Sequence, residues 1–193
     1  RKYSMDGRST YDLYIMAGVN VTCKNITSNS ITDDDRWGIN ATSFSKDVLF
    51  KNCSLNRIDA HEGIYNLTVR DCNIGAKGLT MTGQGKLDVI NTTITAETFI
   101  RLRGDYGSTW NGNVNIIDST FIYKGVNEPK LVMFTLYLDK NGKIHDFGYD
   151  CKYPNINVEN LTVDNRYNTK YNYVVIIPNS EKAGTKYAPD SYW

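Results

Sequence analysis

The sequence has little of what marks several common protein classes. Its 193 residues include only 4 Cys, 4 Pro and 2 His, and the 22 Lys and Arg nearly balance the 21 Asp and Glu, for a net charge of +1. Without a basic excess, broad electrostatic binding to nucleic acid or to an anionic membrane surface is not expected. No stretch approaches about 18 consecutive apolar residues, so the sequence predicts neither a transmembrane helix nor membrane insertion.

The first residues also lack a recognisable targeting signal. Segment 1–6 has no apolar core of the kind that a signal peptide needs, and the sequence does not begin with Met. We therefore interpret the chain as a fragment or a processed product, from which a signal could have been removed.

The composition instead favours strands and turns. The chain has 21 Asn, 18 Thr, 15 Gly and 14 Tyr. All four are poor helix formers; Thr and Tyr favour strands, whereas Asn and Gly favour turns. We expect an all-β protein with almost no long helix.

A short pattern recurs along the chain and predicts strands joined by bends. Each copy has eight positions. The first four alternate between an apolar residue and any residue, the fifth is Asn or Asp, the sixth is small or apolar, the seventh is usually Ser or Thr, and the eighth is apolar. The first half therefore alternates with the two-residue period of a strand. Five copies cover residues 48–55, 67–74, 87–94, 114–121 and 156–163, and a weaker first copy covers 21–27. The Asn or Asp positions, spaced by 27, 19, 20, 27 and 42 residues, are Asn25, Asn52, Asp71, Asn91, Asp118 and Asn160.

These Asn and Asp residues predict corners. Both residue types tolerate the left-handed backbone conformation and can hydrogen-bond their own backbone at a bend. A strand, a one-residue corner and a second strand form an L-shaped unit that cannot bury its apolar face alone, whereas copies stacked about 4.8 Å apart can. Constant corners with variable spacing confine insertions to loops. The sequence therefore predicts a parallel β-helix (β-solenoid) of about six or seven coils, with three short strands in each.

A third strand should complete each coil, and the candidates are residues 58–61, 79–82, 100–103, 132–135 and 174–177. Strand alternation places every second residue inside and the intervening residues in water. The residues expected inside are Ile58, Ala60, Leu79, Met81, Ile100 and Leu102. We expect one β-helix domain over residues 1–178, less regular before residue 45, and a capping or docking tail over 179–193.

The coil pattern over residues 19–178 resembles the right-handed parallel β-helix proteins of the pectate-lyase-like superfamily, which includes phage tailspikes and many surface proteins. Residues 57–63, 102–110 and 145–151 are also similar to stretches of uncharacterised bacterial and phage-associated β-helix proteins. The resemblance implies a right-handed β-helix and an extracellular, cell-surface or virion location. Because spikes often assemble as trimers, a homotrimer is compatible with it.

Polar residues on the third strand form the main candidate site. Those expected to face outward would lie side by side on adjacent coils, as one patch. They are Asp59, His61, Thr80, Thr82, Arg101 and Arg103. The loops that leave this strand would emerge at one corner, and they carry Asp105, Tyr106, Trp110, His145, Asp146 and Tyr149. Long loops on a rigid scaffold are where function concentrates.

Two kinds of catalysis could use this patch. In β-elimination of a uronic-acid polysaccharide, Arg101 or Arg103 would clamp the sugar carboxylate while His61 removes the C5 proton. Hydrolysis would need two carboxylates, and the candidates are Asp59, Asp105 and Asp146. The Arg-x-x-Pro-x-x-Arg element of pectate lyases and the Gly-His-Gly and paired-Asp signatures of polygalacturonase-like hydrolases are missing. The sequence leaves open whether the protein is an enzyme.

Binding without catalysis needs only the surface. Aromatic rings can stack on sugars while Asp, Asn and Arg bond hydroxyls, and the loop residues suited to these contacts are Tyr106, Trp110, His145, Asp146, Tyr149 and Tyr153. Simpler interpretations are an exposed Asp–Arg ion pair, a His that pins a loop, and aromatics that cover the coil. We favour a carbohydrate-interacting surface protein or phage tail spike whose partner is a polysaccharide or cell-surface glycan. A lyase or hydrolase and a purely structural fibre segment are the alternatives.

Other motifs carry little functional signal. Several Asn-x-Ser/Thr sequons are corners of the repeat, so we do not expect glycosylation. The spacing of Cys23, Cys53, Cys72 and Cys151 matches no zinc pattern, and we expect free buried thiols. The run 33–35 of three Asp could recruit Ca²⁺ but is typical of a solvated loop, so we expect no cofactor. Residues 83–86 read as a turn.

Overall fold

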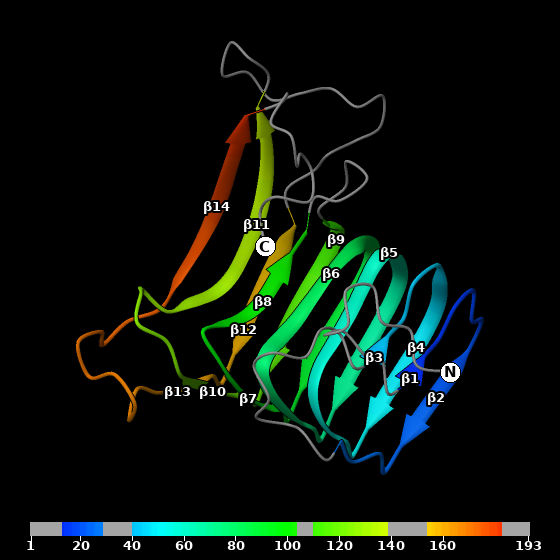
Figure 1. Cartoon of the computed structure of the whole chain (residues 1–193), viewed down its shortest axis with the longest axis horizontal. Helices are drawn as coiled ribbons and strands as arrows, with labels where there is room; N and C mark the ends of the chain where they lie inside the picture. Colours follow the sequence, from blue (N-terminus) through cyan, green and yellow to red (C-terminus); the bar gives the residue numbers. More distant parts are fainter. Residues whose placement is uncertain (1–12, 29–39, 104–109, 139–153, 183–193) are drawn as a thin grey trace, which may run out of the picture.

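The computed structural model describes residues 13–28, 40–103, 110–138 and 154–182. These residues form a single 14-stranded sheet, contain no helix, and pair in parallel wherever two strands meet (Figure 1). No helix among them is long and apolar enough to cross a membrane. The strands are β1 (Leu13–Tyr14), β2 (Val21–Lys24), β3 (Asn40–Ala41), β4 (Ser45–Lys51), β5 (Ser54–Arg70), β6 (Asn73–Ile90), β7 (Thr93–Ala96), β8 (Thr98–Leu102), β9 (Trp110–Ile117), β10 (Thr120–Tyr123), β11 (Lys130–Leu138), β12 (Asn155–Glu159), β13 (Thr162–Asp164) and β14 (Val175–Lys182).

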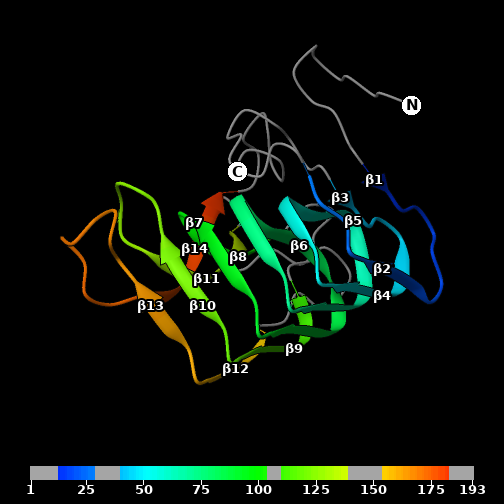
Figure 2. The same cartoon turned by 90° about the horizontal axis from the view of Figure 1, so that it is seen from below.

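The parallel pairs stack the chain into three columns, each containing one segment from successive passes of the chain. The first column, before the corners, contains β2, β4, the ends of β5 and β6, β9 and β12. The second, after the corners, contains the starts of β5 and β6, then β7, β10 and β13. The third contains β1, β3, the middles of β5 and β6, β8, β11 and β14. Figure 2 shows β10 beside β13 and β12 beside β9.

The corners are where the sequence predicts them. All six Asn and Asp residues of the repeat have a left-handed φ, between 46° and 56°. The backbone N–H of each of the first five donates to a carbonyl on the next pass of the chain, as Asn91 N–H does to Ile117 O at 3.0 Å. Side chains also form hydrogen bonds between neighbouring corners. Asn52 Nδ2 donates to Asn25 Oδ1 at 2.7 Å, and Asn91 Nδ2 donates to Asp71 Oδ1 at 2.8 Å.

The core lies on the inner side of the three columns. The six third-strand residues that alternation placed inside are all fully buried, as predicted. Other rows are equally continuous: Leu55, Ile74 and Ile94 follow one another in register and belong to the same cluster. Cys23, Cys53 and Cys72 are buried free thiols, as expected, and Cys151 lies outside the described residues. Burial raises the pKa of the Cys72 thiol to about 11, which keeps it protonated.

Residues 83–86 are not a separate turn, and this corrects the sequence prediction. They lie inside β6, which runs without a break for 18 residues and bends where Gly83 and Gly85 take positive φ. A Cβ atom at Gly83 would lie 2.1 Å from the carbonyl oxygen of Ile64 on the neighbouring strand. These glycines therefore allow two strands to approach closely, which a local turn motif does not reveal.

We expect Asn91→Ala to lower the free energy of unfolding by about 1–3 kcal/mol, because alanine must hold the left-handed φ of 46° and the bond to Asp71 is lost. Asn91→Gly loses the same bond without the steric strain, so it should cost measurably less. Urea unfolding followed by circular dichroism compares the two. Equal losses in both variants would show that strain at the corner is unimportant.

Candidate functional site

The outer row of the third column brings together three predicted site residues. Asp59 on β5 is in register with Thr80 on β6, and Thr80 is in register with Arg101 on β8. Met133 on β11 follows in the same row. The predicted adjacency of these polar residues is confirmed, and it joins positions far apart in the sequence on neighbouring strands.

Their predicted exposure to water is wrong. Asp59 and Arg103 are each 1% exposed, Thr80 and Thr82 are 3% exposed, and only Arg101 is partly accessible. Strand alternation determines which side of a sheet a residue occupies, but it does not determine whether that side is covered. The candidate site is therefore a buried polar cluster, with very different electrostatics from an exposed patch.

Asp59 lies between two arginines. Its Oδ2 is 3.0 Å from Nη2 of Arg57, and its Oδ1 is 3.8 Å from Nη1 of Arg103. All three side chains are nearly inaccessible, so these are not the weak, exposed pairs expected from the sequence. The prediction missed Arg57. Its position two residues before Asp59 on the same strand could have revealed it, because residues i and i+2 share a face.

Arg101 adds a third guanidinium to this cluster. Burial first, and then the positive charges of Arg57 and Arg103, lower the pKa of Arg101 to about 10, while Glu97 opposes the shift. Arg57, Arg101 and Arg103 thus lie close enough to act on one another electrostatically, with Glu97 as an opposing charge on Arg101. Arg101 is the most accessible of the three, and a guanidinium can bind a planar anion such as a carboxylate with two hydrogen bonds.

Trp110 begins β9 and is paired with Gly83 of β6. Its side chain is 1% exposed, and its Nε1 donates to no partner within the described part of the chain. A buried indole presents no open face for stacking on a sugar, and its burial matches the simpler interpretation that the ring covers the coil.

The other predicted site residues cannot be placed against this cluster. His61 lies within β5, but its side chain is not described. The remaining predicted loop residues, Asp105, Tyr106, His145, Asp146 and Tyr149, lie outside the described residues, as do Tyr153 and the three Asp of 33–35. Across the residues that are described, no group of three or more His, Cys, Asp or Glu could hold a metal ion.

Comparison with known proteins gives one informative similarity. The chain matches no family model, and no solved structure matches it. A stretch is 28% identical over 98 residues to a depolymerase specific for the KL64 capsule, from Klebsiella phage P510. The match covers 45% of this chain and 10% of that relative, so the chain corresponds to a small part of the depolymerase. The similarity and the parallel sheet together fit a β-helix-type fold.

Replacing Asp59 should destabilise the protein strongly. Asp59→Asn leaves two buried guanidiniums without their carboxylate, and we expect a loss of about 3–5 kcal/mol in the free energy of unfolding. The control is Asp164→Asn, which breaks an exposed pair with Arg166 and should lower the free energy of unfolding far less. Equilibrium urea unfolding measures both. If the two losses are similar, the Asp59 cluster does not hold the third column together.

Replacing Arg101 should have the opposite effect. Arg101→Gln removes a charge that burial and two neighbouring guanidiniums disfavour, so we expect the free energy of unfolding to rise by roughly 1 kcal/mol. Arg70→Gln, at an exposed position, should change it by less than about 0.5 kcal/mol. Thermal and urea unfolding provide the measurement. A clear loss of stability in Arg101→Gln would mean that its pairing outweighs the repulsion.

Proposed function

We propose that this chain is part of a phage tail or surface protein that presents a polysaccharide-binding face on a rigid β-solenoid. The observation that carries the proposal is the similarity to a phage capsule depolymerase, over a stretch comprising 45% of the chain. The proposal extends to a virion or extracellular location, where a capsule-binding protein meets its ligand.

The solenoid itself is part of this proposal. Successive windings of one coil produce three columns of parallel strands. They also repeat a left-handed Asn or Asp where each winding passes from the first column to the second. We propose right-handed winding with three short strands in each of about six or seven coils. A rigid stack of this kind holds side chains from many passes in fixed register, which favours binding of an extended polymer.

The Arg101 cluster supports an acidic sugar as the ligand. The guanidiniums of Arg57, Arg101 and Arg103 lie in one cluster, and a guanidinium is suited to a uronic-acid carboxylate. In this scheme Asp59 is a positioning residue, because it lies between Arg57 and Arg103 and holds their guanidiniums in place. Arg101, the most accessible of the three arginines, contacts the sugar.

A degradative enzyme is the second candidate, and the depolymerase similarity is the observation that favours it. In elimination, Arg101 neutralises the substrate carboxylate while a base, for which His61 is the candidate, takes the C5 proton. The C4–O bond then breaks, a C4–C5 double bond forms, and the leaving oxygen takes a proton. Hydrolysis would instead pair Asp59 with Asp105 or Asp146. The engagement of Asp59 by two arginines favours elimination over hydrolysis.

The test is a binding assay on purified Klebsiella capsular polysaccharides, KL64 included, with neutral dextran as the negative control. We expect salt-sensitive binding to at least one acidic capsule, weakened about tenfold in Arg101→Gln, because a desolvated charged contact contributes about 1.4 kcal/mol or more. Arg166→Gln, which removes an exposed arginine, should bind normally. Absence of binding across the panel would contradict the proposal and favour a purely structural segment.

The same samples separate binding from degradation. A lyase generates an unsaturated product with new ultraviolet absorbance, whereas a hydrolase releases reducing ends without it. Binding with neither signal identifies the chain as a recognition module.

A further inference from the structure

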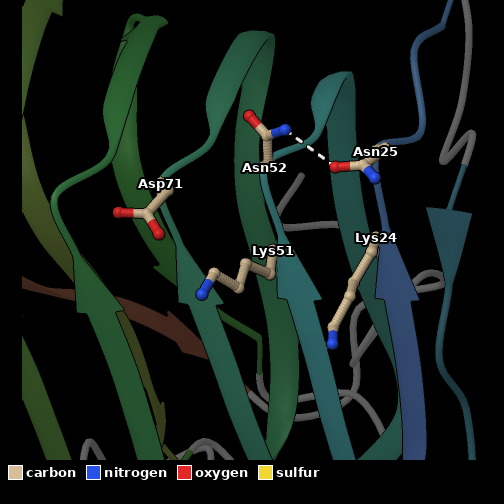
Figure 3. Close-up of a pocket in the computed structure, with 5 residues that line it drawn as sticks. All are labelled: Lys24, Asn25, Lys51, Asn52 and Asp71. Atoms are coloured by element: carbon tan, nitrogen blue, oxygen red, sulfur yellow. Dashed lines mark hydrogen bonds between the residues drawn. The ribbon is translucent and has the colours of Figure 1, made fainter.

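A second electropositive feature lies on the first column, away from the Arg101 cluster. A pocket of about 310 Å³ lies beside the corners and is lined by Lys24, Asn25, Lys51, Asn52 and Asp71 (Figure 3). These residues come from the ends of β2 and β4 and from three successive corners. Nothing in the Asp59 and Arg101 cluster contributes to it.

The lysines belong to a row of cations set by strand register. Lys24 is paired with Lys51, and Lys51 is paired with Arg70, so the three lie on consecutive strands about 4.8 Å apart. All three are exposed. The same row continues through Ile90 and Ile117 and ends at Glu159, so the positive charge is confined to one end of the stack.

The corner side chains give the pocket a second, neutral type of contact. Asn52 Nδ2 donates to Asn25 Oδ1 at 2.7 Å, which fixes the orientation of both amides. Within the described residues, the Nδ2 group of Asn25 has no acceptor of its own. Figure 3 shows both lysine side chains extending along one side of this amide pair, with Asp71 beyond Asn52. The carboxylate of Asp71, which accepts a bond from Asn91, can accept further bonds from hydroxyls.

We infer that this pocket is a binding subsite for a carboxylated polysaccharide that lies across the strands, along the direction in which the coils stack. Lys24 and Lys51 contact successive carboxylates, while the Asn25–Asn52 pair and Asp71 bond sugar hydroxyls. The inference rests on the proposed function for its ligand class, but it concerns a different column of the fold.

The chemistry favours an acidic glycan over a nucleic acid. The pocket has no aromatic residue among its lining for bases to stack on, and Asp71 repels closely spaced phosphates. A sugar chain that alternates carboxylates with hydroxyls suits the mixture of ammonium, amide and carboxylate groups. The repeat of cations from strand to strand also matches an extended polymer better than a small isolated anion.

The test is an NMR titration with oligogalacturonate, using malto-oligosaccharides of matched length as the uncharged control. We expect saturable shifts of the side-chain amide signals of Asn25 and Asn52 with the acidic probe only. The double substitution Lys24→Gln and Lys51→Gln should weaken binding about threefold to tenfold, as two exposed ionic contacts allow. The matched control, Lys46→Gln with Lys124→Gln, removes the same charge from exposed positions outside the pocket.

Absence of shifts at Asn25 and Asn52, or equal weakening in the two double variants, would overturn the inference. The capsule panel keeps this failure distinct from failure of the proposed function. If the Lys24 and Lys51 substitutions leave capsule binding unchanged, the pocket is not a subsite, but the proposed function stands. If the pocket amides shift with oligogalacturonate and no capsule binds, the pocket binds carboxylated chains, but the proposed capsule-binding function is wrong.

Discussion

Stacking in register is the constraint on which the rest of the structure depends. At each corner the backbone must turn sharply while its N–H still reaches a carbonyl on the next pass, and the left-handed conformation of Asn or Asp satisfies both needs. Because every pass turns at the same place, apolar residues fall into continuous buried rows. The columns keep this register even though the spacing between corners varies from 19 to 42 residues.

The same stacking concentrates charge. In the third column it gathers Arg57 and Arg103 around Asp59 and puts Arg101 two strands away in the same row, where burial makes both attraction and repulsion strong. In the first column it aligns Lys24 and Lys51 at the surface, where water screens them and each contact is weak. The two features therefore differ in kind. The buried cluster orients a few charges rigidly, whereas the exposed row adds modest contacts along a polymer.

Function concentrates where the repeat is irregular or polar. The apolar rows build the core, and the fold alone specifies no ligand. A carboxylated polysaccharide is consistent with both electropositive features.

The amino-acid pattern alone determined the corners, the strands before them and the inward rows, because these depend on local backbone preference and two-residue alternation. It also placed Asp59, Thr80 and Arg101 side by side. Only the tertiary structure decided that Asp59, Arg103 and Trp110 are buried, that Arg57 joins the cluster, and that Gly83 permits close strand contact. Burial and approach distance depend on what packs against a residue from other passes of the chain, and local sequence carries no record of that neighbour.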